Sequence, residues 1–133
     1  MSVRVAWDNT AKTIVRYVFE GRWTWNEFYP AYDEAIAMEK SMPHRVHVIV
    51  DLRKGVGVPA NALMHVKNIS DKQPDNIGLT VLVTTSSFVH SLYQIGVKFY
   101  HKIGYYFRVV DSMDEAYTMI AESDAAYVSK SEI

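Results

Sequence analysis

Cysteine is absent from the 133 residues of the chain, and several kinds of chemistry are excluded with it. Disulfides, cysteine nucleophiles and thiolate metal sites all need a sulfur that this chain does not have. The absence also fits a reducing compartment. The stretch from Met1 to Arg4 lacks the apolar run of a signal peptide, and no stretch reaches the roughly 18 consecutive apolar residues that a membrane span needs. We therefore expect a cytoplasmic protein.

An excess of charge of one sign is absent as well. The chain has 14 lysines and arginines against 15 aspartates and glutamates, a formal net charge of −1, and no segment that concentrates the basic residues. Proteins that bind nucleic acid neutralise rows of phosphates, so we expect no nucleic-acid partner. Hydrophobic residues make up 49% of the chain, which is typical of a globular protein. We expect a single domain over residues 1–124, followed by a frayed polar tail at 125–133.

Apolar segments predict five strands, at about residues 3–7, 13–20, 46–52, 79–84 and 106–110. The first two strands flank a short polar turn and predict a hairpin. The last three alternate with helical segments at about 25–40, 60–71, 87–103 and 112–122, which predicts parallel pairing through crossover helices. Thr24 with Glu27, and Ser112 with Glu115, have the spacing of a capping box. The predicted fold class is α/β, with a five-stranded mixed sheet and four helices.

This order of elements resembles the STAS domains, the sulfate-transporter and anti-sigma-factor-antagonist modules. The resemblance covers about residues 3–122 and is carried by the element order, the Val50-Asp51-Leu52 end of the central strand and the capped last helix. The resemblance is in particular to the small, stand-alone SpoIIAA-like proteins of unknown role. The resemblance implies a non-catalytic module that works by binding. Anti-sigma antagonists are phosphorylated on a serine in the loop after that strand, but the stretch 55–61 of this chain has neither serine nor threonine.

One candidate ligand site follows from the predicted topology. The carboxyl ends of parallel strands gather at one edge of a sheet, where α/β folds bind ligands. The candidate residues at this edge are Asp51, Arg53, Lys54, Gly55, Gly57, Thr84 and Thr85. A Gly-x-Gly before a helix is a weak anion-binding pattern, because it offers bare amides and a positive helix end. A simple connecting loop is the alternative interpretation, and both stay open.

A second candidate site lies in the segment 87–103, whose apolar residues cover an arc of roughly 200° where about 100° would serve one-sided packing. The stripe that we expect to face the core is Phe88, Leu92, Ile95, Phe99 and Ile103. The second stripe is Val89, Tyr93, Val97 and Tyr100. We expect this second stripe to form a homodimer interface. The wall of an apolar pocket and further monomer core are the alternatives.

Residues for catalysis or metal binding do not stand out. The five histidines lack metal-ligand spacing, and His90, flanked by serines on a predicted helix, does not have the geometry of a triad. We expect no catalytic residue, no metal and no cofactor. The predicted function is that of a non-enzymatic STAS-like interaction or regulatory module, homodimeric and without a phosphorylatable serine in its loop. The alternative is a small carrier or sensor of an apolar, lipid-like ligand.

Overall fold

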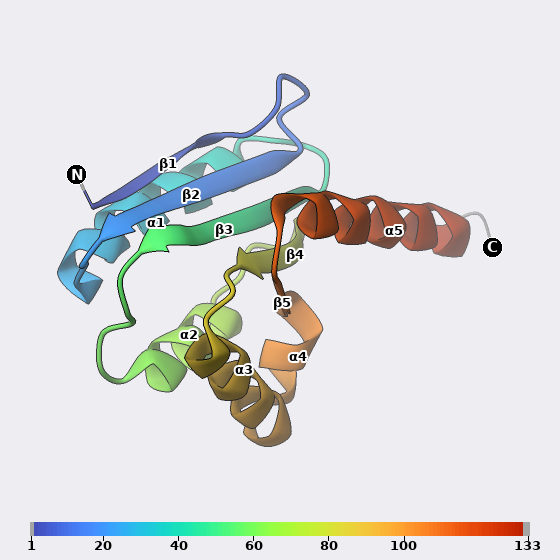
Figure 1. Cartoon of the computed structure of the whole chain (residues 1–133). Coiled ribbons are helices and arrows are strands. Elements are labelled where there is room, and N and C mark those ends of the chain that lie inside the picture. Colours follow the sequence, from blue (N-terminus) through green and yellow to red (C-terminus); the bar gives the residue numbers. More distant parts are fainter. Residues whose placement is uncertain (1, 132–133) are drawn as a thin grey trace.

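In the computed structural model, which describes residues 2–131, five strands form one mixed sheet with helices on both of its faces (Figure 1). The strands are β1 (Val3–Trp7), β2 (Ile14–Gly21), β3 (Val46–Gly55), β4 (Ile77–Val83) and β5 (Phe107–Val110). The helices are α1 (Trp25–Lys40), α2 (Ala62–Asp71), α3 (Ser87–Phe99), α4 (His101–Tyr106) and α5 (Met113–Ser131). The predicted fold class is confirmed, with one short helix, α4, added.

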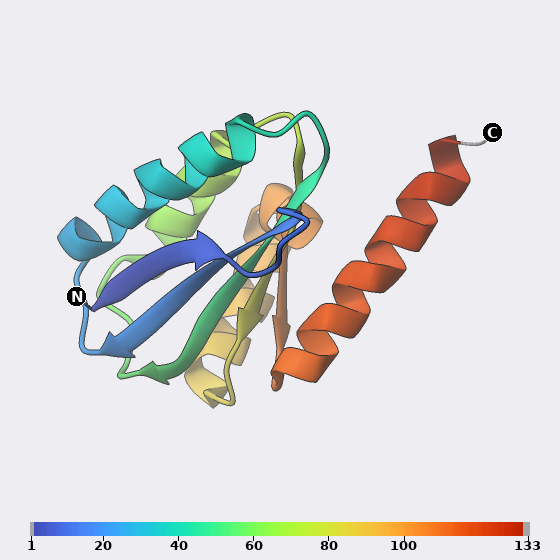
Figure 2. The ribbon, with the colours of Figure 1, turned by 90° about the horizontal axis from the view of Figure 1, so that it is seen from above.

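The order of the strands explains how the helices are distributed. The sheet runs β1-β2-β3-β4-β5, with β1 and β2 antiparallel and every later pair parallel. Crossovers between parallel strands are right-handed, and each one here advances by one strand in the same direction. Such crossovers place their helices on the same face, so α1 to α4 share one face and α5 covers the other (Figure 2). Among residues 2–131, no helix combines the length and apolar character needed to cross a membrane.

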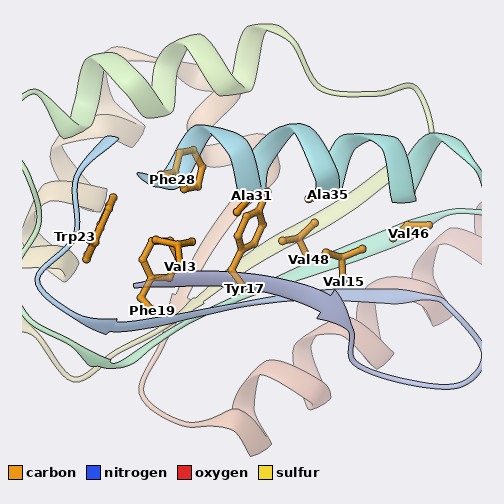
Figure 3. Packing of buried hydrophobic residues seen from close by; sticks show 10 residues of the cluster. All are labelled: Val3, Val15, Tyr17, Phe19, Trp23, Phe28, Ala31, Ala35, Val46 and Val48. Carbon is orange, nitrogen blue, oxygen red and sulfur yellow. The ribbon is translucent and has the colours of Figure 1, made fainter. Parts of the chain in front are cut away.

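The first core lies between α1 and the sheet. Because side chains alternate along a strand, every second residue of β2 and β3 points toward α1 (Figure 3). Tyr17 and Phe19 meet Phe28, and the small residues Ala31 and Ala35 let the helix approach the strands closely. The capping box of Thr24 and Glu27 forms as predicted and starts α1 at Trp25.

The second core lies under α5, where Ile49, Val81 and Val83 of the sheet meet Ala116 and Ile120. Ser112 and Glu115 exchange the hydrogen bonds of the predicted capping box. However, α5 continues to Ser131, so the residues 125–131 that were predicted as tail are helical, and the last two residues of the predicted tail, 132–133, lie outside the described residues.

A tertiary contact accounts for the greater length of α5. His47 is 1% exposed, and its Nε2 lies 2.6 Å from Asp124 Oδ1 beyond the predicted end of the helix. Arg45 donates to Ser123 Oγ, and its guanidinium lies over the Tyr127 ring. These contacts join the start of β3 to the second half of α5. They do not appear in the apolar periodicity of the helix.

The predicted helix 87–103 is broken at Tyr100, where the backbone is extended. The break lets α4 fold back, so Ile103 packs against α3 at Gly96 and is 2% exposed. A Cβ on Gly96 would lie 3.2 Å from Ile103 Cδ1 and 3.0 Å from Leu63 Cδ2, so the missing side chain is what allows this approach. We call α2, α3 and α4 together the α2–α4 lobe.

Candidate functional site

The outer side of α3 carries a line of exposed apolar side chains. Phe88 is 61% exposed, Ile95 47% and Phe99 74%, with the half-buried Leu92 between them. The stripe that contains them was predicted to face the core. That prediction is wrong for Phe88, Ile95 and Phe99, whereas Ile103 of the same stripe is buried. Large exposed apolar side chains at helical spacing are typical of an interaction surface. We call Phe88, Leu92, Ile95 and Phe99 the outer line.

The inner side of α3 is formed by the stripe that was predicted as an interface. Val89 is buried, and the Tyr93 hydroxyl donates to the Phe107 carbonyl at 2.8 Å. Val97 and Tyr100 are partly exposed at the margin of this side. The 200° apolar arc therefore exists. Val89 and Tyr93 of the predicted interface stripe turn inward, while Val97 and Tyr100 of the same stripe are exposed. Gly96 lies on the same inner side, where a Cβ would crowd Leu63 and Ile103.

The space between the inner side of α3 and the sheet is not completely filled. A cavity of about 120 Å³ lies there, with a wall of apolar atoms. Its lining comes from Phe19, Trp23, Trp25, Phe28, Val50, Leu52, Val58, Ala62, Val66, Ile69, Leu82, Val89, Leu92 and Phe107. A second cavity of about 60 Å³ adjoins it and is lined by Ala62, Leu63, Val66, Leu82, Val89, Leu92, Tyr93, Ile103 and Phe107. Val89 and Tyr93, two of the predicted pocket candidates, line this second cavity.

A cleft of about 310 Å³ lies at the carboxyl ends of β3 and β4. It is lined by Leu52, Gly55, Gly57, Val58, Thr84, Ser86, Phe88 and Val89, and it shares Leu52, Val58 and Val89 with the larger cavity. Gly57 has φ +68°, a left-handed conformation that glycine adopts without strain. Three of the residues predicted for this edge, Gly55, Gly57 and Thr84, are thus brought together.

The other residues predicted for this edge lie elsewhere. Asp51 is buried and holds two guanidiniums, with Arg16 Nη2 at 2.7 Å and Arg53 Nε at 2.9 Å. Burial opposes ionisation of Asp51, but the hydrogen bonds from Arg53 and Arg16 outweigh it and hold the pKa of the carboxyl well below its usual range. Lys54 lines a separate depression beside Arg4 and Arg16. Arg53 and Lys54 therefore do not line the cleft with the glycines.

Thr85, the last residue of that prediction, is exposed and does not line the cleft either. Its neighbour Thr84 is buried, and Thr84 Oγ1 accepts a hydrogen bond from Ser86 N at 3.1 Å. Ser86 in turn caps α3 through a bond from Val89 N. The turn from β4 into α3 is therefore fixed by two hydroxyls that face the cleft.

Aromatic side chains fasten α2 to α1 at the opposite side of the cavity. Trp25 Nε1 donates to the Ala60 carbonyl at 2.8 Å, and the Trp25 ring stacks on His65 with 4.1 Å between centroids. The Tyr29 hydroxyl is hydrogen-bonded to His65 Nδ1. Neither Trp25 nor His65 was assigned a role from the sequence. These contacts hold the start of the α2–α4 lobe in place without filling the cavity behind it.

The imidazole of His90 is bound by a carbonyl and a carboxylate. His90 Nε2 lies 3.0 Å from the Thr84 carbonyl and 3.0 Å from Asp111 Oδ1, so the imidazole is engaged with these groups rather than with a serine hydroxyl. Among residues 2–131, no group of three His, Cys, Asp or Glu side chains is arranged to hold a metal ion. Comparison of the chain with family models, curated proteins and solved structures gave no match. The chain is an α/β protein with a five-stranded mixed sheet.

Proposed function

We propose that the chain is a non-enzymatic, STAS-like interaction module whose first partner is a second copy of itself, bound through the outer line of α3. The observation that carries this proposal is the exposure of Phe88, Ile95 and Phe99 on one side of one helix. The resemblance to STAS domains agrees with a module that acts by contact. The glycine loop lacks a phosphorylatable residue, so regulation by loop phosphorylation is not part of the proposal.

The spacing of the outer line supports a two-fold contact. Phe88, Leu92, Ile95 and Phe99 are separated by four, three and four residues, so the pattern reads the same in both directions. If two copies of α3 pack antiparallel about a two-fold axis, Phe88 lies against Phe99 of the other copy and Leu92 against Ile95. In such an interface one surface covers its own copy, and no second surface is required. The outer line is therefore suited to self-association.

Crosslinking tests this arrangement directly, because the natural chain has no cysteine. The double variant Phe88→Cys/Phe99→Cys is expected to form a disulfide-linked dimer under mild oxidation. The two positions lie about 16 Å apart along the helix, too far for a bond within one chain. The matched controls are Phe88→Cys and Phe99→Cys alone, which the antiparallel geometry leaves uncrosslinked. Crosslinking of either single variant would contradict the antiparallel arrangement.

Light scattering tests the dimer itself. The wild-type chain is expected at twice its 15.2 kDa mass, and Ile95→Glu at a single chain mass with an unchanged circular dichroism spectrum. The half-exposed Ile95 can be replaced without disturbing the core, whereas a buried carboxylate in the interface is costly. Tyr105→Glu is the control, since Tyr105 is exposed on α4 but lies off the outer line. A monomeric wild type, or a dimeric Ile95→Glu variant, would overturn the proposal.

The alternative function, a carrier or sensor of an apolar ligand, is favoured by a different observation. It depends on the cavity between α3 and the sheet. Ile95 and Phe99 of the outer line do not border that cavity, so variants at these two positions test the dimer separately. A dimeric module with a ligand site in each chain would combine them.

A further inference from the structure

The face of the α2–α4 lobe that turns toward the sheet is incompletely packed. Within the described chain, the buried residues of α2 and α3 are Ser70, Val89 and Gly96. Leu63, Val66 and Leu92 also turn toward the inside, yet they remain only half-buried, and each borders one of the two cavities. Protein interiors are normally close-packed, so unfilled apolar space of this extent is a departure that a ligand can use.

The size of the space limits the ligand. The two cavities measure about 120 and 60 Å³ and share walls formed by Val66, Leu82 and Leu92. A dry apolar cavity of about 150 Å³ is enough to bind benzene. Rotation of the shared leucine side chains joins the two spaces into one that accepts a single or fused ring, or a short alkyl chain. A phospholipid is far too large for it.

The opening limits the chemistry of the ligand. The cleft of about 310 Å³ adjoins the larger cavity at Leu52, Val58 and Val89, so it provides the route inward. Its lining residues, all within 2–131, include hydroxyls and glycine backbone but no charged side chain. The nearest arginine in sequence, Arg53, is bound to Asp51 instead. A charged ligand would lose its hydration here without gaining a counter-ion, whereas a neutral polar group can be hydrogen-bonded.

We propose that each chain binds a small neutral molecule with an apolar body, of about benzene to indole size, and one hydrogen-bonding end. The body lies between the sheet and α3, against Leu82, Leu92 and Phe107. The polar end lies in the cleft beside Thr84 and Ser86. Thr84 is suited to this, because the bond from Ser86 N uses an oxygen lone pair and not the hydroxyl proton. Phe88 and Leu92 border both this site and the outer line, whereas Ile95 and Phe99 line neither the cavities nor the cleft.

A matched pair of probes tests the proposal. Benzyl alcohol and benzoate have the same ring, but only benzoate is charged. Benzyl alcohol at about ten times its Kd is expected to raise the melting temperature of the wild-type protein by several degrees, since a ligand stabilises the state that binds it. Saturation-transfer NMR is expected to place its ring against the protein. Benzoate is expected to bind at least ten-fold more weakly. Equal or tighter binding of benzoate would overturn the proposed neutral end.

Variants of the cavity wall test the location. Ala62 lines both cavities, so Ala62→Leu fills them and is expected to abolish the benzyl alcohol shift with an unchanged circular dichroism spectrum. Val66→Phe serves as the second filling variant if the first does not fold. Leu92→Ala enlarges the space and is expected to improve indole binding several-fold. Ile95→Glu, the dimer variant, is expected to bind as wild type does. Binding that persists in both filling variants, or no binding of either neutral probe to the wild type, would overturn the site.

Discussion

The same face of the sheet is covered by α1 at one end and by the α2–α4 lobe at the other, and the two ends are packed differently. Under α1 the side chains of Phe28, Ala31 and Ala35 are buried, and the aromatic rings of β2 fill the space between helix and strands (Figure 3). Two cavities border the lobe, the larger of which reaches Phe19 and Phe28 at the edge of the α1 end, and large apolar side chains of α3 face outward. Both ends are rich in apolar residues, so composition does not explain the contrast.

The positions of the small residues explain it. In α1 the small residues Ala31 and Ala35 face the strands, so the helix approaches the sheet and the space closes. In α3 the small residue on the inner side is Gly96. It lies against Leu63 and Ile103, which belong to the lobe itself. The lobe therefore packs tightly within itself and loosely against the sheet. We infer that the α1 end supplies stability and that the lobe supplies surfaces for binding.

Truncation of one side chain at each end should give the largest difference. Phe28→Ala removes a ring that stacks on Tyr17 and Tyr32, both with 5.7 Å between centroids, and it should lower the free energy of unfolding by about 3–5 kcal/mol. The Phe28 and Leu92 side chains both border the larger cavity, but Leu92 is only half-buried, so the expected loss for Leu92→Ala is about 1–2 kcal/mol. Urea denaturation with both variants measures the two losses. Equal losses would mean that the lobe contributes to the core as much as α1 does.

The pH dependence of stability should also come from the α1 end. Glu39 is 2% exposed, and burial raises the pKa of its carboxyl from 4.5 to about 7. The folded chain keeps a proton there that the unfolded chain releases, so Glu39 weakens the fold above pH 7 and this penalty disappears as the pH falls toward 4.5. At about 1.4 kcal/mol per pH unit, the penalty is about 3 kcal/mol. Glu39→Gln should therefore stabilise the protein by about 2–3 kcal/mol at pH 8 and by much less at pH 5.

A control residue on the same helix, and a histidine whose pKa is shifted in the opposite direction, make this measurement more specific. Glu34 is exposed, so Glu34→Gln should change stability little at either pH.

Burial lowers the pKa of His47, which means that the folded chain favours its neutral form. The stability that His47 contributes is present above pH 6.5 and is lost as the pH falls. In the Glu39→Gln variant this loss should become visible in urea denaturation below pH 6.5. A flat profile there would contradict the assignment to His47.

The fold could be predicted because its signals are local. Alternation along the strands, the capping boxes at Thr24 and Ser112, and the strand-helix order are all legible in the sequence, and each is found in the structure. What could not be predicted depends on tertiary contacts. The break at Tyr100 is coupled to packing of Ile103 against Gly96, and the second half of α5 is joined to β3 through Asp124.

The candidate sites show the same division between what the sequence predicts and what depends on tertiary contacts. Topology was enough to bring Gly55, Gly57 and Thr84 to one cleft, because the carboxyl ends of parallel strands meet. Topology could not reveal that Asp51 binds Arg53 on its own strand and removes it from that cleft. For α3, the sequence indicated an apolar arc that is too wide for one-sided packing. Periodicity fixes the width of such an arc but not which half turns inward.

Two glycines provide the finest comparison, because the added group is a single methyl in both cases. A Cβ on Gly78 would overlap the imidazole of His47, which is held between Leu79 N and Asp124. Gly78→Ala should therefore cost about 1–3 kcal/mol, as overpacking of a rigid site does. A Cβ on Gly96 would press on the methyl ends of Leu63 and Ile103, which both border the 60 Å³ cavity and can move into it. Alanine also gains about 1 kcal/mol over glycine in a helix.

These two effects offset each other at Gly96, so Gly96→Ala should stay within about 1 kcal/mol of the wild type. Urea denaturation of both variants at one pH measures the difference, with the slope of the transition as a check that the unfolded states are alike. We expect the free energy of unfolding of Gly96→Ala to be close to that of the wild type, and that of Gly78→Ala to be clearly lower. If Gly96→Ala lost as much stability as Gly78→Ala, the Leu63 side chain would be unable to move aside. The lobe would then be as rigid as the sheet around His47, and the contrast between the two regions would fail.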